Sequence, residues 1–426
     1  MSIIELGEVR GEPASPSPVR GPRAAGRPLG SAVVSLLSLV LLAGATPPAQ
    51  RTVSVVTASR MATAYLAADH VFVVDPPTPD GDRYLTAYAQ PSPHGAGVRR
   101  RWHAPLARIG DYLDVRVEWG LVLATAATEP NQVFQTTAFD GATGQQRWRH
   151  RGALQPTAGG GLLLTDVRED GTGVMSRVEP DTGRLLWSVP LPRPAHPTFH
   201  RDSEGRVDRF VLLQPTGEVQ VHDAGTGDLL RSVDTLPGDR SAYQRVHVVD
   251  DLLLLVPPGS TRLVSFGLAD LSPLWTAEVT LVSHVLGCGG LLCAVPQTGG
   301  VQVLDPATGE VRWSELGQDN LADVRQGRLL MVRPGWGYTM RDAATGQVRI
   351  ELGTWSLLPV RRPDDPLVGV RRTDGGRMVV AELDLEAGRT WIVDVLPGIA
   401  GSCQASLPIL LCQRLDGTTA LWRLTR

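Results

Sequence analysis

A short motif that recurs along most of the chain is the strongest constraint on its fold. Its fullest form is an Asp-x-x-Thr-Gly turn after an apolar run, followed four residues later by Trp, as in Asp140–Gly144 with Trp148. Recurrence at a nearly fixed period means that one supersecondary unit is repeated and stacked on its copies. The copies, some of them degenerate, place these residues at the Trp position: Trp102, Trp148, Trp187, Arg231, Trp275, Trp313, Ile350 and Trp391.

The spacing of these positions indicates the size and type of the unit. Neighbouring copies lie 37 to 46 residues apart, which is the length of one four-stranded propeller blade. Apolar runs such as Val71–Val74 and Leu252–Val256 have the length of strands, and turn-forming residues separate them. The chain also holds 46 Gly and 33 Pro, as many turns require. We therefore predict an all-β body over residues 51–426.

Each residue of the motif has its own physical role in this prediction. The Asp and Thr side chains can hydrogen-bond to the turn backbone, and Gly adopts a positive φ without steric cost. The Trp then lies on the next, outer strand, where its ring can pack against the neighbouring blade. We predict a structural, blade-docking role for these residues: Trp102, Trp148, Trp187, Trp275, Trp313, Trp391, Gly144, Gly183, Gly227, Gly309 and Gly346.

The motif resembles the pyrroloquinoline-quinone-like (PQQ-like) repeat family, whose consensus is Ala-x-Asp-x-x-Thr-Gly followed by Trp. Six copies in this chain keep most of the turn. The resemblance implies a ring of eight four-stranded antiparallel blades, in which the turn and the Trp lock adjacent blades together. The eight Trp-equivalent positions agree with that number, so an eight-bladed β-propeller is the preferred prediction.

The two ends of the chain leave a nine-bladed ring open as an alternative. Ile409–Cys412 and Gly417–Trp422 resemble two inner strands that lack an outer one. Thr52–Val56 could supply that outer strand, because a propeller leaves no open sheet edge when both termini share a blade. If Ala62–Val74 then begins a blade of its own, the ring has nine blades.

The four cysteines form two close pairs, Cys288 with Cys293 and Cys403 with Cys412, each around a short turn that contains Gly or Pro. A zinc site would need four ligands, and His284 is the only histidine near either pair. In a tight hairpin the two sulfurs of a pair can meet across the strands. We expect two structural disulfides in an oxidising compartment, with buried free thiols as the alternative.

The N-terminal region differs in character from the repeats. Residues 1–30 carry four Arg among Pro, Ser and Gly, which predicts a disordered cytoplasmic leader. Residues 31–48 contain an uncharged run rich in Leu, Val and Ala, which predicts one hydrophobic helix that is either a transmembrane anchor or a signal segment. The arginines before it orient the chain with the propeller outside the cytoplasm. We expect a single-pass cell-membrane protein, with secretion after signal cleavage as the alternative.

No constellation of residues in the chain points to catalysis. The quinone-dependent dehydrogenases that share this ring architecture carry two adjacent cysteines against the cofactor, and here no two cysteines are adjacent. His196 and His200 have metal-like spacing without a recognised third ligand, so we expect neither a cofactor nor a metal site. A net charge of −3 without a basic stripe argues against binding to nucleic acid.

These features predict a membrane-tethered extracytoplasmic propeller that is a scaffold for a protein or an envelope polymer rather than an enzyme. The first alternative is a small-ligand receptor or a quinone-type oxidoreductase that uses the central channel. The second is a cell-surface module with a purely structural role.

Overall fold

The computed structural model describes the chain over residues 52–57, 62–91, 97–108, 110–128, 133–235, 245–257, 259–359 and 365–424. The leader and the hydrophobic segment predicted over residues 1–30 and 31–48 lie outside these ranges. The described residues hold 36 strands. No helix within them is long and apolar enough to cross a membrane. Residues 51–426 form one compact unit.

The strands form seven sheets of four strands and one of eight. A single parallel pair, Gly300 with Asn320, joins the two halves of the eight-stranded sheet, and each half is itself an antiparallel group of four. The 36 described strands therefore make nine four-stranded blades.

The first four blades along the chain contain β2 to β17. Blade 1 comprises β2 (Thr63–Ala67), β3 (His70–Val74), β4 (Arg83–Ala89) and β5 (Arg99–Leu106). Blade 2 comprises β6 (Asp111–Glu118), β7 (Leu121–Thr128), β8 (Val133–Asp140) and β9 (Gln146–Arg151). Blade 3 comprises β10 (Ala153–Pro156), β11 (Leu162–Val167), β12 (Gly173–Val178) and β13 (Leu185–Leu191). Blade 4 comprises β14 (Thr198–Arg201), β15 (Val207–Leu213), β16 (Glu218–Asp223) and β17 (Leu229–Asp234).

The next four blades contain β18 to β33. Blade 5 comprises β18 (Arg245–Val249), β19 (Leu252–Val256), β20 (Arg262–Gly267) and β21 (Pro273–Glu278). Blade 6 comprises β22 (Val282–Gly287), β23 (Leu292–Pro296), β24 (Gly300–Leu304) and β25 (Val311–Leu316). Blade 7 comprises β26 (Asn320–Arg325), β27 (Arg328–Arg333), β28 (Gly337–Asp342) and β29 (Val348–Gly353). Blade 8 comprises β30 (Ser356–Leu357), β31 (Leu367–Arg372), β32 (Met378–Asp384) and β33 (Arg389–Leu396).

The last blade joins strands from both ends of the described chain, and we call it the closing blade. It comprises β34 (Ile399–Ser406), β35 (Ile409–Arg414), β36 (Thr419–Arg423) and β1 (Thr52–Thr57). β1 is its outer strand and pairs antiparallel with β36, with Val53 opposite Trp422. The all-β propeller predicted from the sequence is confirmed. Its blades number nine, the alternative that the sequence left open, because β1 is an outer strand without a Trp-equivalent position.

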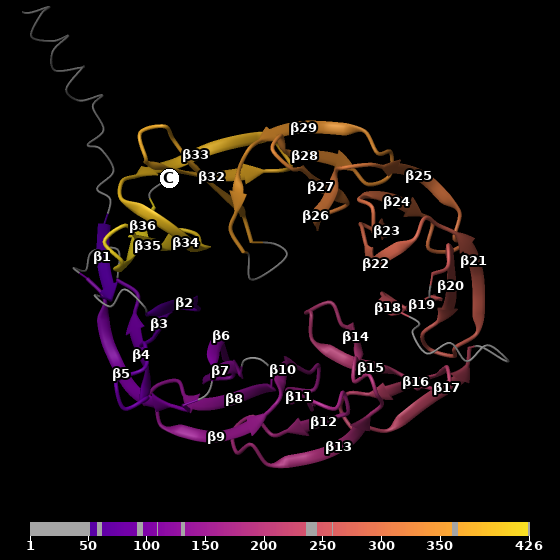
Figure 1. Ribbon diagram of the computed structural model, residues 1–426, viewed down its shortest axis with the longest axis horizontal. Helices are drawn as coiled ribbons and strands as arrows, with labels where there is room; N and C mark the ends of the chain where they lie inside the picture. The colour runs from indigo at the N-terminus through magenta and orange to yellow at the C-terminus, as the bar shows by residue number, and fades with distance from the viewer. Residues whose placement is uncertain are drawn as a thin grey trace, which may run out of the picture. The chain divides into compact units, whose positions relative to one another are not determined.

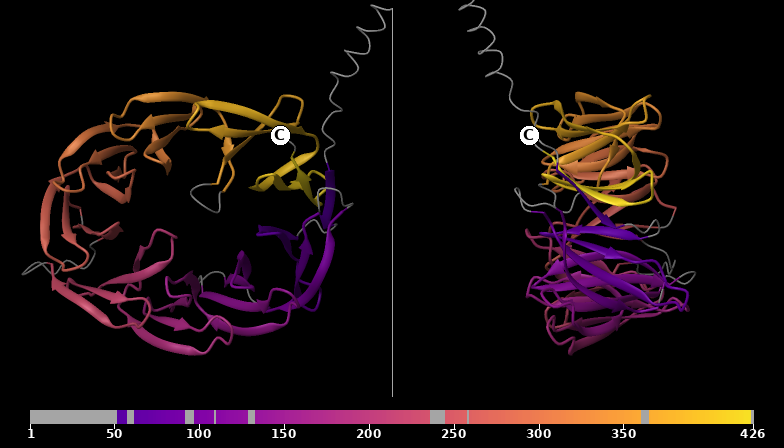
Figure 2. Two further views of the ribbon diagram at one scale, coloured as in Figure 1. Left: turned by 180° about the vertical axis from the view of Figure 1, so that it is seen from behind. Right: turned by 90° about the vertical axis from the view of Figure 1, so that its left-hand side faces the viewer.

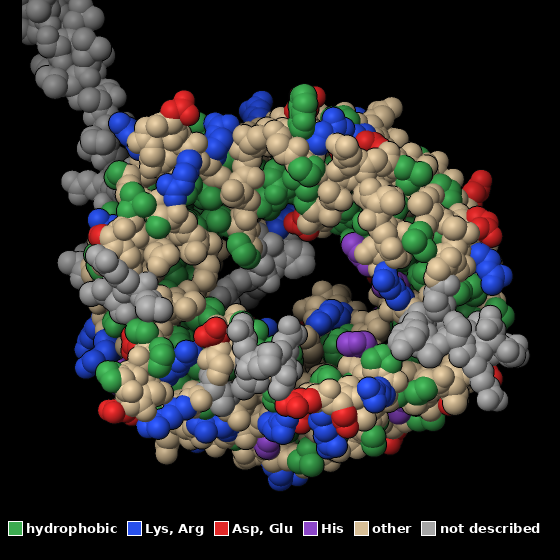
Figure 3. Space-filling view, viewed as in Figure 1, with side chains coloured by type: hydrophobic (Ala, Val, Ile, Leu, Met, Phe, Trp, Pro, Cys, Tyr) green, Lys and Arg blue, Asp and Glu red, His purple; other side chains and the backbone are tan. Residues whose placement is uncertain are grey.

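The blades surround a central channel (Figure 1), and the side view shows that they stand side by side in a single layer (Figure 2). The first strand of each blade is innermost, as β2, β6, β14 and β22 illustrate. The space-filling view shows that the channel is open (Figure 3). The outer strands β5, β9, β13, β17 and β21 form the perimeter.

The hydrophobic core lies between adjacent blades instead of at the centre of the ring. Nine clusters of buried side chains are present among the described residues, one at each interface. Leu85 and Trp102 of blade 1, for example, pack with Val115 and Phe139 of blade 2. Because burial stabilises by about 25 cal/mol per Å² of apolar surface, these interfaces hold the ring together.

Both predicted disulfides are confirmed. Cys288 and Cys293 are bonded across the β22–β23 hairpin, with their Cα atoms 5.9 Å apart. Cys403 of β34 is bonded to Cys412 of β35. No free cysteine remains, which excludes the alternative of buried thiols.

Candidate functional site

The repeated Trp and Gly residues meet at the interfaces between blades. The indole nitrogen of Trp148 on β9 donates a hydrogen bond to the carbonyl of Pro180 in the next blade, at 2.5 Å. The ring covers Gly183, which has a φ of +68°. A Cβ on that residue would lie 2.4 Å from Cγ of Trp148. Four further joints have this form: Trp102 with Gly144, Trp187 with Gly227, Trp275 with Gly309 and Trp313 with Gly346.

The Asp of the motif holds the turn in shape. The Asp140 carboxylate accepts hydrogen bonds from the amides of Ala142 and Thr143, and the amide of Gly144 donates to the Asp140 carbonyl. A hydrogen bond from Arg147, together with those from Thr143, holds the pKa of the Asp140 carboxyl well below its ordinary value. The turn thus presents its Gly to the neighbouring Trp in a fixed conformation.

The joint between blades 4 and 5 is built differently. Arg231 stands where six other blades have Trp, and Leu271 stands where the next turn would have Gly. Leu271 adopts a φ of +57°, and its side chain is buried in the cluster between the two blades. Hydrogen bonds from Ser272 lower the pKa of Asp270 in that turn, and the charge of Arg231 adds to this effect. Here the turn itself supplies the apolar side chain.

The predicted docking role is wrong for Trp391 on β33, because 54% of its surface is exposed. The closing blade has no turn between its last two strands, since β36 and β1 come from opposite ends of the chain. Trp391 therefore has no Asp-x-x-Thr-Gly turn to cover. The sequence motif could not reveal this absence, which follows from the closure of the ring.

The outer rim differs between groups of blades at the residue just before the Trp position. Four blades have Arg there, and three of these arginines form ion pairs with the Asp of their own turn: Arg147 with Asp140 at 2.6 Å, Arg349 with Asp342 at 3.2 Å, and Arg312 with Asp305. Blades 3, 4 and 5 have Leu instead. Together with two neighbouring leucines they form an exposed set that we call the leucine row: Leu185, Leu186, Leu229, Leu230 and Leu274.

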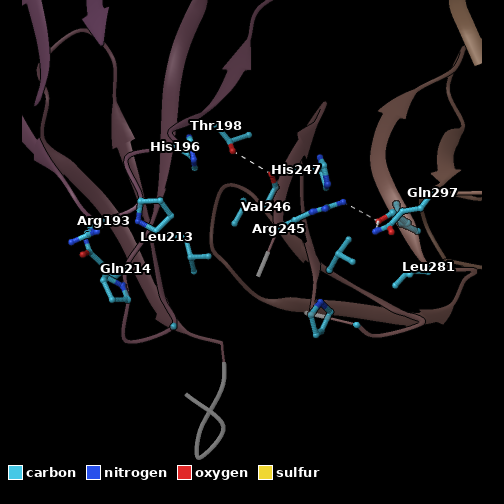
Figure 4. Close-up of a pocket in the computed structure, with 17 residues that line it drawn as sticks. Arg193, His196, Thr198, Leu213, Gln214, Arg245, Val246, His247, Leu281 and Gln297 are labelled. Carbon is cyan, nitrogen blue, oxygen red and sulfur yellow. Dashed lines mark hydrogen bonds between the residues drawn. The ribbon is translucent and has the colours of Figure 1, made fainter. Parts of the chain in front are cut away.

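A cavity of about 670 Å³ lies between blades 4, 5 and 6 (Figure 4). We call this cavity the basic pocket. Its polar lining comes from segments that are distant in the sequence: Arg193, His196, Thr198, Gln214, Arg245, His247 and Gln297. The space-filling view shows Arg and His side chains gathered at this side of the channel (Figure 3). No Asp or Glu is among the described residues that line it.

Hydrogen bonds to the backbone hold the strand ends around this pocket. Arg245 donates to the carbonyls of Val282 and Ser283 in blade 6, at 3.2 and 2.9 Å. Thr198 of blade 4 donates to the carbonyl of Val246 at 3.2 Å. The three blades are therefore connected at this point by polar contacts (Figure 4).

The electrostatic environment of the pocket is positive. Burial, together with the charges of His284 and Arg245, lowers the pKa of His247 to about 4. A histidine with this pKa is neutral at pH 7, so the permanent charge comes from the arginines. The arrangement suits an anionic group better than a metal cation.

Two segments of the chain, residues 99–315 and 215–357, match the family model PQQ_2, described as outer membrane protein assembly factor BamB. The matched region spans more than half of the chain. This chain belongs to the BamB family of PQQ-like propellers. The predicted resemblance to PQQ-like repeats is thereby confirmed.

Comparison with other known proteins gives structural similarity only. No curated protein matches the chain significantly by sequence. BamB from Moraxella catarrhalis is 14% identical, with 73% of this chain and 96% of that chain covered and a TM-score of 0.43. A europium-containing methanol dehydrogenase is 9% identical, with 78% and 84% covered and a TM-score of 0.43. The designed protein Ika8 is 17% identical, with 74% and 96% covered and a TM-score of 0.48.

The two histidines that sequence analysis considered are separated in this BamB-family ring. His196 lines the basic pocket, whereas His200 forms a hydrogen bond with Asp208. The described residues hold no group of three or more His, Cys, Asp or Glu that could bind a metal ion. Sequence reasoning missed the basic pocket, because Arg245 and Gln297 belong to no motif and lie on different blades.

Proposed function

We propose that this chain is a membrane-tethered extracytoplasmic scaffold that binds a protein partner through the leucine row. The observation that carries the proposal is the replacement of Arg by Leu at one rim position in three successive blades. Membership of a family described as an outer membrane protein assembly factor supports a role in binding other proteins.

The leucine row has the properties of an interaction surface. In blades 2, 6 and 7 the corresponding Arg forms an ion pair with the Asp of its turn, as Arg147 does with Asp140. Leu186, Leu230 and Leu274 replace that pair with apolar side chains that are 38 to 50% exposed. Exposed apolar side chains grouped on successive blades favour a protein interaction site. Five leucines without an aromatic side chain favour a protein surface over a polysaccharide.

The location outside the cytoplasm has independent support. The disulfides Cys288–Cys293 and Cys403–Cys412 are of a kind that persists in oxidising compartments. The uncharged run within residues 31–48 follows four arginines, as the positive-inside rule requires for export of the propeller. N-terminal sequencing of the mature protein from membranes tests the anchor, because a new N-terminus near residue 46 would mean a cleaved signal instead.

A crosslinking experiment tests the partner site. A photo-crosslinking amino acid is placed at position 230, and separately at position 316, in the full chain expressed in its own cells. Leu316 is an outer-strand leucine outside the leucine row, and it is 54% exposed compared with 39% for Leu230. We expect a discrete protein adduct from position 230 that is absent from position 316.

Substitutions in the leucine row provide the matched control. The triple variant Leu186→Arg, Leu230→Arg and Leu274→Arg gives blades 3 to 5 the residue that other blades already carry, so the fold should tolerate it. The adduct should disappear in this variant and persist in Leu316→Arg. Adducts of equal yield from both positions, or none from either, would refute the proposal.

The proposed role includes no catalytic step. We expect calcium and pyrroloquinoline quinone to leave the thermal midpoint of the protein unchanged, because only a ligand that binds the native state raises it. A rise that depends on concentration would instead support the quinone-type oxidoreductase.

A further inference from the structure

We propose that the basic pocket binds a small organic anion, with its carboxylate or phosphate group beside Arg245 and its apolar part against the leucine and valine side chains of blades 4 to 6. This site lies among the inner strands, whereas the leucine row is on the outer strands. The inference therefore does not depend on the scaffold role.

The arrangement of β18 directs two polar side chains into the pocket. Arg245 and His247 are two residues apart on this strand, so they project from the same face. Both line the cavity. The lowered pKa of His247, to which Arg245 contributes, agrees with a positive potential at this position. An anionic ligand would reduce that potential.

The charge of Arg245 is not neutralised by an ion pair with any described residue, whereas Arg193 lies near Asp170, whose pKa is lowered by hydrogen bonds from Thr172 and by the charge of Arg193. Neither Arg193 nor Arg245 forms an ion pair with another described residue, and the cavity lining includes no carboxylate. In the rest of the ring many arginines are paired, as Arg333 is with Asp319. Hydrogen bonds to the two carbonyls of blade 6 use only one of the terminal nitrogens of Arg245. Within the described part of the chain its other donors have no hydrogen-bond partner, so they can bind a ligand.

The remaining lining sets the size and nature of the ligand. A volume of about 670 Å³ falls within the range of small-molecule sites. Leu213, Val256 and Leu281 give the cavity apolar walls, while the amides of Gln214 and Gln297 add neutral hydrogen-bonding groups. Such sites combine apolar contact with a few polar groups that orient the ligand. The chemistry fits one acidic group on an apolar body.

Calorimetric titration of the full-length protein with phenyl phosphate and benzoate tests this site. Phenol has the same ring without the charge, and inorganic phosphate has the charge without the ring. We expect phenyl phosphate or benzoate to bind at least tenfold more tightly than phenol and inorganic phosphate, with an affinity that falls as NaCl is added. Absence of binding by both anionic aromatic probes, or equal binding by phenol, would overturn the proposal.

Variants locate the binding to the pocket. Arg245→Gln should weaken binding at least tenfold, and Arg245→Lys should restore part of it. Arg193→Gln offers a second test that leaves the carbonyl contacts of Arg245 intact. Arg312→Gln, an exposed arginine on the outer rim, is the matched control and should leave the affinity unchanged. If Arg312→Gln weakens binding as much as Arg193→Gln and Arg245→Gln, the site lies elsewhere and the proposal fails.

Failure of this inference and failure of the scaffold role can be distinguished. Substitutions in the leucine row should abolish the crosslinked adduct and leave phenyl phosphate binding unchanged. Arg245→Gln should have the opposite pattern.

Discussion

Two successive joints, between blades 3 and 4 and between blades 4 and 5, are filled by a large apolar side chain from different blades. The earlier blade supplies it in the first joint, and the later blade supplies it in the second. In the first, Trp187 reaches from β13 over Gly227, which has no side chain to obstruct it. In the second, Arg231 supplies no comparable apolar surface, and Leu271 of the next turn fills the interface. In both joints one large apolar side chain packs near the rim, and either blade can provide it.

The comparison explains why Gly is required in some turns only. The left-handed conformation costs an L-residue about 1–2 kcal/mol, and Leu271 tolerates it because its side chain gains buried contacts. At Gly227 a side chain would meet the Trp187 ring, with a Cβ only 2.7 Å from it. The residue at the Trp position therefore determines what the following turn can contain.

The first prediction concerns the largest expected difference between the two kinds of joint. Trp148→Ala should destabilise the protein by about 3–5 kcal/mol, because a buried aromatic side chain is lost and a cavity remains. Arg231→Ala should change stability by no more than about 0.5 kcal/mol, since an exposed side chain is removed. Urea unfolding followed by circular dichroism measures both variants. Equal losses would mean that the Trp ring does not dock the blades.

The second prediction tests whether the Trp ring is the reason for the Gly. Gly183→Ala should cost about 2–4 kcal/mol, combining the left-handed conformation with overpacking against Trp148. In the Trp148→Ala background the same change should cost only about 1–2 kcal/mol, because the steric conflict is gone. A double-mutant cycle gives this coupling. Additive losses would show that the clash plays no part.

The third prediction converts one joint into the other. Arg231→Trp alone should destabilise by about 1–3 kcal/mol, because the new ring meets the Leu271 side chain. Arg231→Trp combined with Leu271→Gly should be more stable than the sum of the single changes predicts, by about 1 kcal/mol or more. The measurement is again urea unfolding of the four proteins in the cycle. Leu271→Gly with Arg231 retained is the control, since it leaves the interface without any large side chain.

The sequence predicted the joints better than the surfaces. The spacing of Asp140, Gly144 and Trp148 specifies a turn and its contact within one local segment, so the motif could be recognised without a structure. The ninth blade was only an alternative, because β1 pairs with β36 across the whole length of the chain. The exchange of Arg for Leu before the Trp position was visible in the repeats, but its exposure was not.

The basic pocket illustrates the limit of local reasoning. Arg193, Arg245 and Gln297 lie in loops or strand ends of different blades, and the ring alone brings them together. Their chemistry has no characteristic spacing, because the number of residues between inner strands varies from blade to blade. Alignment of the blades by their turns would have placed these residues near the channel, yet not in one cavity.

The last prediction uses pH to separate the basic pocket from the Trp–Gly joints, with the smallest expected effect. His247 on β18 lines the basic pocket, and its pKa of about 4 is below the ordinary value of 6.5 because of burial and the charges of His284 and Arg245. The unfolded chain then binds more protons between these values, so stability present above pH 6.5 is lost as the pH falls toward 4. The lowered pKa values of Asp140 and Asp305 in the Trp–Gly joints cause losses only below about pH 4. Urea midpoints between pH 7 and 4 should therefore fall less steeply in His247→Gln than in the unmodified protein. An Asp305→Asn variant should keep the full slope in this range, and a slope that depends on Asp305 but not on His247 would contradict the assignment.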